Sequence, residues 1–416
     1  MAGWDVCCLS GFFGKERETR VITASICLTF EPSFAILWLG YANRNTRHRR
    51  LGYENFREAL IKSARAVSER FFGQSRYRKR RNTWCISHFR YRRVGGKDPL
   101  TAADDLFRGS LVFGAGVLGC NLARNLLRAG KDVTLLARGN WAEAIQKNGL
   151  RIKDKFSLRT SVTRIPVVTE LRPEDMYDVI FVVMRYTQIG AIADVLRANP
   201  TKNIVFVGND VRTRAVVASL PEKNVMFAFA LSAGHREPDR VASIDLKKII
   251  IGQLPGMPSN EQLIGRIFDG TKYKVVYEPN MEDYLLCHAA FVIPATFACY
   301  KTDGDLKKLK GNTTYLSRMI DANIGAYRAI RDAGHEILPK ADAEFEGAAY
   351  RKTCLRFFKL MCATSPGKIC ASDHAMNAVD EMSALNRDLK QFFDEHGAAY
   401  PVWQALEKEA GKYIAH

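Results

Sequence analysis

The 416-residue chain is 47% hydrophobic and 25% charged, which is typical of a globular protein with room for two packed domains. Its ten cysteines are scattered without a C-x-x-C pair, which excludes the common zinc-binding patterns and favours a reducing, cytoplasmic location. The net charge is +18, but residues 1–108 contribute +11 of it, so the basic excess says little about the remainder.

Residues 1–108 are predicted to be a basic, poorly ordered extension. Glu31 and Pro32 interrupt the apolar run at 21–42, so this run predicts neither a membrane helix nor a secretory signal. Arginines and aromatic residues alternate at 76–93, a mixture that suits single-stranded nucleic acid. We interpret the segment as a solvated basic leader, and we do not predict nucleic acid as a partner. A third interpretation is that the segment is not part of the functional protein.

From Ser110 onward, apolar strands alternate with amphipathic helices. Strands are expected at 110–116, 131–138, 177–185, 202–209, 224–231 and 247–254. Helices are expected at 117–130, 188–198, 211–219 and 260–268. This α/β alternation predicts a Rossmann-type domain over residues 109–279, in which helices cover both faces of a parallel sheet.

No strand is predicted after residue 280, so residues 280–416 are expected to form an all-α domain for substrate binding and dimerisation. Its helices are expected at 281–300, 313–333, 341–362, 371–395 and 400–414. The functional site should lie in the cleft between the two domains. We expect a small-molecule partner, no membrane and a possible homodimer.

A G-x-G-x-x-G motif joins the first strand to the first helix and consists of Gly114, Ala115, Gly116, Val117, Leu118 and Gly119. In this context the motif predicts dinucleotide binding. Gly114 would permit the tight turn, Gly116 would let a pyrophosphate approach the backbone, and Gly119 would let helix and sheet pack closely. The alternative is a glycine-rich turn without a ligand.

Arg138 ends the second strand, where NAD-binding chains carry a carboxylate for the ribose 2′-hydroxyl. An arginine can instead bind a 2′-phosphate through two charge-assisted hydrogen bonds. The nearest acid beyond it is Glu143. We therefore predict NADP(H) as the cofactor and no metal; the alternative is that Arg138 is merely solvated.

Residues 110–416 resemble the ketopantoate reductase (2-dehydropantoate 2-reductase) family, which acts in pantothenate biosynthesis. The opening strand, glycine motif and Arg138 carry the resemblance, together with VVMRYTQ, FVGND and LSAGHRE. The resemblance implies that Arg185 and Gly234 lie near the cofactor and that Asn209 contacts cofactor and substrate. Glu381, sixteen residues before Gly397, has the placement of the family's active-site glutamate.

One departure concerns the family's proton donor, a lysine on the first helix of the C-terminal domain, which is followed by substrate-binding asparagines. The register, anchored by Pro294 and the segment DGDL, aligns the lysine and three asparagines with Leu285, Ala289, Ile293 and Asp303. No lysine lies between Lys274 and Lys301. The family's donor is therefore expected to be absent, and the wall of the site should be apolar and suit a substrate less hydroxylated than ketopantoate.

His288 is the candidate substitute, because an imidazole titrates near neutral pH and His288 lies three residues after Leu285. The alternative is a histidine satisfied in the helical core; Tyr284 and Arg185 are weaker candidates. Ser372 is a candidate substrate contact, together with Asn209 and Asp303.

His374 and Glu381 are expected to share one helical face, because they lie seven residues apart in the helix predicted at 371–395. Glu381 is a candidate for catalysis and for contact with the cofactor; a solvated helix face is the alternative.

Two functions remain open. The first is an NADPH-dependent reductase of a small 2-oxo acid or related carbonyl, with Asn209, His288 and Glu381 as catalytic residues. The second is a catalytically silent NADP(H)-binding protein or sensor, which the missing lysine would favour. The sequence does not identify the substrate.

Overall fold

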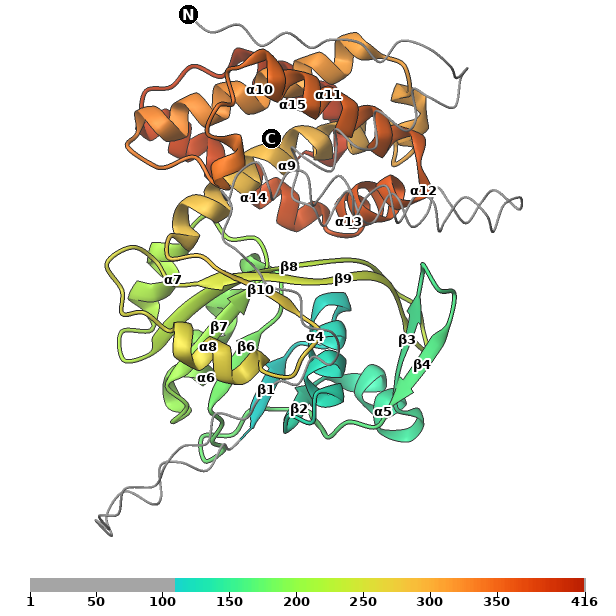
Figure 1. Cartoon of the computed structure of the whole chain (residues 1–416), viewed down its shortest axis with the longest axis vertical. Helices are drawn as coiled ribbons and strands as arrows, with labels where there is room; N and C mark the ends of the chain where they lie inside the picture. Colours follow the sequence, from blue (N-terminus) through green and yellow to red (C-terminus); the bar gives the residue numbers. More distant parts are fainter. Residues whose placement is uncertain (1–108, 415–416) are drawn as a thin grey trace, which may run out of the picture. The chain divides into compact units, whose positions relative to one another are not determined.

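The computed structural model describes residues 109–414, and the basic extension expected at 1–108 lies outside them. The N-terminal part of the described chain contains a ten-stranded sheet with the strand order β4-β3-β9-β8-β7-β6-β1-β2-β5, and β10 pairs with β9 (Figure 1). The strands are β1 (Ser110–Phe113), β2 (Val133–Leu136), β3 (Leu150–Asp154), β4 (Thr160–Thr163), β5 (Val167–Val168), β6 (Val179–Val182), β7 (Asn203–Val207), β8 (Asn224–Arg236), β9 (Val241–Gly252) and β10 (Lys274–Tyr277).

Helices follow most of the parallel strands. They are α4 (Val117–Arg128), α5 (Gly139–Asn148), a 3-10 helix (Tyr186–Ile192), α6 (Ala193–Ala198), α7 (Thr213–Ser219) and α8 (Glu261–Phe268). Alternate residues of β1 face opposite sides of the sheet, so Val112 packs in the cluster with α4 and α5, whereas Leu111 and Phe113 pack in the other cluster. The Rossmann-type α/β fold predicted from the sequence is confirmed.

The sheet is mixed rather than purely parallel. Strands β5, β2, β1, β6, β7 and β8 run parallel, but β8 and β9 form a long antiparallel pair. The strand expected at 224–231 is longer than predicted, because β8 continues through most of the segment LSAGHRE as far as Arg236. Gly234 makes this pairing possible, because a Cβ atom there would lie 2.2 Å from the Ala242 carbonyl oxygen.

The C-terminal part is helical, as expected. Its helices are α9 (Met281–Lys301), α10 (Thr313–Asp332), α11 (Ala348–Ala363), α12 (Ser365–Gly367), a π-helix (Lys368–Ser372), α13 (Asp373–Asn377), α14 (Val379–Glu395) and α15 (Pro401–Ala410). The single helix expected at 371–395 is wrong, since Ala378 leaves the helical conformation with φ −133° and ψ 40°. His374 and Glu381 therefore belong to different helices.

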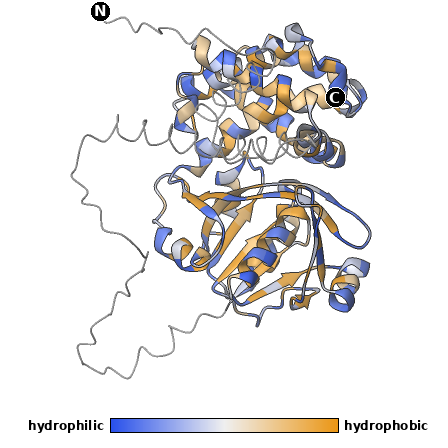
Figure 2. Cartoon of the chain, turned by 45° about the vertical axis from the view of Figure 1, so that its right-hand side comes forward, coloured by the Kyte–Doolittle hydropathy of each residue, from blue (hydrophilic) through white to orange (hydrophobic). Residues whose placement is uncertain are grey.

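Helix α9 is the central element of this layer and contacts α10, α14 and α15 (Figure 1). It is apolar on nearly all sides, which explains its orange colour in Figure 2. Among the described residues it is the one helix long and apolar enough to cross a membrane, yet 83% of its apolar window is buried within the protein. Its composition is therefore that of a core helix.

The first turn of α9 is anchored by a buried carboxylate. Asp283 accepts a 2.7 Å hydrogen bond from the Glu336 amide, and its other oxygen lies 2.6 Å from Nδ1 of His335. The side-chain amide of Asn280 also donates a hydrogen bond to Asp283. The hydrogen bond with Asp283 raises the pKa of His335 above its ordinary value.

We predict a pH-dependent contribution of His335 to stability. A raised pKa in the folded state means that this contribution is complete below the unfolded-state pKa of about 6.5 and is lost as pH rises through the folded-state pKa. In urea unfolding, the difference between wild type and His335→Asn should be largest near pH 6 and should shrink toward pH 9. His396→Asn is the control, because the ring of His396 faces the Phe392 carbonyl instead of a carboxylate. A difference that grows with pH would contradict the assignment.

Candidate active site

The turn after β1 is built by glycines that fill two different needs. Gly114 has φ +121°, and a Cβ there would lie 2.2 Å from the carbonyl oxygen of Val183. A Cβ on Gly119 would lie 2.0 Å from the Gly114 carbonyl oxygen. At Gly116, by contrast, a Cβ would meet nothing within 4 Å. Two glycines therefore bring helix and sheet together, and the third leaves an open cradle.

The N-terminus of α4 faces this cradle without a cap. Gly116 is the N-cap, no side chain caps the helix, and its first turn carries no acidic residue. The first backbone N–H groups of a helix lack intrahelical partners and attract anions. Ala115, Val117 and Leu118 line the same cavity. These features fit the pyrophosphate of a dinucleotide.

Two arginines line the cavity near the end of β2. Arg138 is exposed and makes no hydrogen bond or ion pair with any described residue. Arg236 lies over the ring of Trp141 at 5.5 Å, and Trp141 donates a 2.9 Å hydrogen bond to the Ala115 carbonyl. Sequence reasoning found Arg138 but missed Arg236, whose place depends on the extension of β8.

A buried acid–amide pair, Glu381 and Asn209, lines another part of the same cavity. Glu381 on α14 is 6% exposed, and burial raises the pKa of its carboxyl group to about 7 despite a hydrogen bond from Asn209 and the charge of Arg185. Asn209 follows β7, and its Oδ1 atom is buried without a hydrogen-bond partner in the described chain. An unpaired amide oxygen facing a cavity can receive a ligand's donor.

Arg185 joins the sheet to the helical layer. Its guanidinium donates to the Asp380 carboxylate at 2.6 Å and to the Asn377 carbonyl at 2.5 Å. Arg185 also lines the cavity. It is thus held by protein groups, unlike Arg138.

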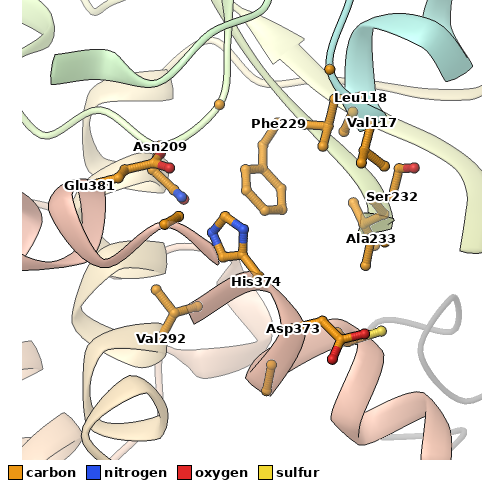
Figure 3. Close-up of a pocket in the computed structure, with 18 of the residues that line it drawn as sticks. Val117, Leu118, Asn209, Phe229, Ser232, Ala233, Val292, Asp373, His374 and Glu381 are labelled. Atoms are coloured by element: carbon orange, nitrogen blue, oxygen red, sulfur yellow. The ribbon is translucent and has the colours of Figure 1, made fainter. Parts of the chain in front are cut away.

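His288 and His374 both line the cavity, with different surroundings. The ring of His288 lies 4.0 Å from that of Phe229 and stacks 6.4 Å from that of Tyr284. Burial, assisted by nearby His374, lowers the pKa of His288 to about 4. Burial also lowers the pKa of His374, which projects into the space beside Asn209 and Glu381 (Figure 3). A His288 that is neutral at pH 7 does not suit the proton-donor role expected of it.

Three residues of α9 that were expected to face the site lie in the core instead. Leu285, Ala289 and Ile293, expected at the lysine and asparagine positions, are 1%, 1% and 0% exposed and lie in the core. The residues with the same spacing that line the cavity are Tyr284, His288 and Val292. Successive residues of a helix differ by about 100°, so a slip of one position turns the side chain from cavity to core.

Two expected substrate contacts do not reach the cavity. Asp303 is exposed beyond the end of α9, where Tyr413 donates to it at 2.9 Å and Lys412 lies 3.3 Å away. Ser372 is 1% exposed and donates to Cys299. Both side chains are therefore occupied by protein partners. Gly234, which the family resemblance placed near the cofactor, does line the cavity.

The cavity has a volume of about 1090 Å³ and extends from the glycine turn to the helices of the C-terminal part. The expected residues that it brings together are Gly114, Ala115, Gly116, Val117, Leu118, Arg138, Arg185, Asn209, Gly234, His288 and Glu381. Gly119 lies just behind this wall in α4. No cluster of three potential metal ligands occurs within residues 109–414.

Comparison with known proteins relates this architecture to a family. Residues 110–256 match the model of the family described as ketopantoate reductase PanE/ApbA. No curated protein matches the chain in a sequence search.

Solved structures share the fold at low sequence identity. A PanE/ApbA family ketopantoate reductase from Ralstonia eutropha JMP134 has 19% identity and a TM-score of 0.58, with 73% of this chain and 98% of that chain covered. The 2-dehydropantoate 2-reductase from Geobacter metallireducens GS-15 has 17% identity and a TM-score of 0.59, with coverage of 72% and 98%. D-Mandelate dehydrogenase, solved with NADH and anilino(oxo)acetate, has 12% identity and a TM-score of 0.59, with coverage of 73% and 98%.

Gly116 and Gly119 should respond differently to substitution by alanine. Gly119→Ala should lower the free energy of unfolding by about 1–3 kcal/mol, because its methyl group would overlap the Gly114 carbonyl. Gly116→Ala should leave it nearly unchanged, since φ is −78° and no atom lies near the added methyl group. Urea unfolding without ligand measures both values, and equal losses would contradict the assigned packing.

Proposed function

We propose that the protein is an NADPH-dependent oxidoreductase, because residues 110–256 match the model of the ketopantoate reductase PanE/ApbA family. It reduces the carbonyl group of a small 2-oxo acid or related compound to an alcohol. The observation that carries the proposal is that an open phosphate cradle and a buried acid–amide pair face the same cavity. A cofactor held at the first would present its reactive ring toward the second.

Residues of the sheet would hold the cofactor. The open space at Gly116 and the uncapped start of α4 suit the pyrophosphate. The unpaired guanidinium of Arg138 suits a 2′-phosphate, with Arg236 as a second cation nearby. When bound, NADPH supplies the hydride that reduces the carbonyl carbon.

Glu381 is the group we assign to proton transfer, in place of His288. Hydride addition leaves an alkoxide, which needs a proton from a positioned acid. A carboxyl group with a pKa of about 7 is protonated in a large fraction of molecules at neutral pH, whereas an imidazole with a pKa of about 4 is not. The side-chain NH2 group of Asn209 orients Glu381 through a hydrogen bond. The Oδ1 atom of Asn209 has no partner in the described chain and can accept a hydrogen bond from the alcohol.

A silent NADP(H)-binding protein is the second candidate function. It is favoured by the cavity face of α9, where Tyr284, His288 and Val292 offer no lysine. Stopped-flow oxidation of NADPH with a panel of 2-oxo acids separates the two, because only a reductase consumes NADPH in the presence of substrate. A role in pantothenate biosynthesis, a homodimer and a cytoplasmic location remain predictions.

Arg138→Ala should weaken NADPH binding by roughly 1.5–3 kcal/mol, the usual value of hydrogen bonds to a charged group. NADH binding should be nearly unchanged, because NADH lacks the 2′-phosphate. Calorimetric titration with both cofactors measures the difference. Arg159→Ala removes the same charge from an exposed site outside the cavity and should leave both affinities unaltered. Tighter binding of NADH than of NADPH by the wild type would refute the assignment.

Glu381→Gln should lower kcat by about 10²–10⁴-fold, because the amide cannot supply the proton. In the wild type the donor is the protonated form, so kcat should fall as pH rises through about 7, and the variant should lose this dependence. Cofactor affinity should persist. Glu395→Gln, on the exposed end of the same helix, is the control. A wild-type rate that stays constant from pH 6 to pH 8.5 would exclude Glu381 as the donor.

A further inference from the structure

The part of the cavity inside the helical layer is strongly apolar. We call this part the apolar chamber. Helices α9, α11 and α14 and the segment before α11 supply its wall, which includes Val292, Ala295, Leu338, Leu360, Met361 and Met382. All six side chains are hydrocarbon or thioether. The chamber therefore offers dispersion contacts and removes water from apolar groups.

Two hydroxyl groups that border the chamber, those of Thr296 and Tyr327, are already engaged with protein atoms. The Thr296 hydroxyl donates to the Val292 carbonyl at 3.1 Å, as a helical side chain does when it turns back onto its own backbone. The Tyr327 hydroxyl donates to Asp342 at 3.1 Å. A ligand hydroxyl placed here would lose hydrogen bonds to water and would have to compete for these groups.

The chamber is continuous with the end of the cavity where Glu381 and Asn209 lie. His374 and Val292 flank this junction (Figure 3). A carbonyl group hydrogen-bonded near Glu381 can therefore extend its remaining carbon chain into the chamber. The polar groups define where the carbonyl lies, and the apolar wall defines what is attached to it.

We propose that the substrate carries an aliphatic or aromatic side chain without hydroxyl groups, which the apolar chamber binds. This inference rests on the proposed reductase function. The chamber selects against hydroxylated side chains because a buried hydroxyl without a partner is disfavoured. It selects for size because each added methylene group gains contact with the wall.

The test compares 2-oxopentanoate with 4-hydroxy-2-oxobutanoate, in which a hydroxyl replaces the terminal methyl group at nearly equal length. With the full chain and NADPH, kcat/KM should be about 10-fold or more higher for 2-oxopentanoate. Phenylpyruvate should exceed pyruvate in the same direction. Equal values, or a preference for the hydroxylated compound, would overturn the proposal.

Binding in the presence of NADP⁺ separates the chamber from the chemistry, because the oxidised cofactor has no hydride to give to a ketone. Calorimetry should show the same preference for 2-oxopentanoate. If this preference is present and neither compound is reduced with NADPH, the result supports the proposed role of the chamber and contradicts the proposed reductase function. If both compounds are reduced without the preference, the result supports the reductase function and contradicts the proposed role of the chamber.

A matched pair of variants locates the effect. Leu360→Asn places an amide of the same branched shape in the chamber wall and should reduce the preference for the methyl over the hydroxyl compound by about 10-fold. Leu355→Asn, on the same helix but outside the cavity, should leave the preference unchanged. The ratio of the two binding constants is insensitive to the folded fraction, so it remains informative if either variant is less stable. An unchanged ratio in Leu360→Asn would overturn the proposal.

Discussion

The close approach of α4 to the end of β1 is the constraint on which the site depends. The two elements meet with so little space that Gly114 and Gly119 have no room for side chains. This contact fixes where the uncapped helix start points, and the cradle at Gly116 opens as a result. Every other group of the site is arranged around that opening, on elements that pack against the sheet edge formed by the carboxyl ends of β1, β6 and β7.

Burial determines which groups at the reaction end carry protons. Removal from water disfavours charge on acids and bases alike, so it raises the pKa of Glu381 and lowers the pKa of His288 and His374. The cavity thus combines an acid that is protonated in a large fraction of molecules at neutral pH with imidazoles whose charged form is disfavoured. This arrangement can protonate an alkoxide without a lysine, and it also agrees with an apolar substrate, since fewer formal charges face the chamber.

Local sequence signals were sufficient where a feature depends on neighbours in the chain. The glycine motif, Arg138 at the end of β2 and the alternation of strands and helices were all visible this way, and the fold class is confirmed. Features set by distant contacts were not. Arg236 required the pairing of β8 with β9, and the pKa of His288 depends on burial beside Phe229, which is remote in sequence. The face of α9 that lines the cavity could not be identified either, because an almost uniformly apolar helix has no periodic pattern that marks this face. The break at Ala378 has no signal in the local sequence, since neither glycine nor proline occurs there.

Arg185 shows that the reaction end is shared between the two halves of the chain. Arg185 follows β6, and its guanidinium donates hydrogen bonds to the Asn377 carbonyl and the Asp380 carboxylate, where α13 ends and α14 begins. Asn209 comes from one half, and the carboxyl group that it orients comes from the other. A fragment ending before α9 would therefore retain the cradle for a nucleotide while lacking the acid. Exchange of the helical half between related proteins would replace the proposed proton source and the proposed substrate wall together, so these two properties would change in one step.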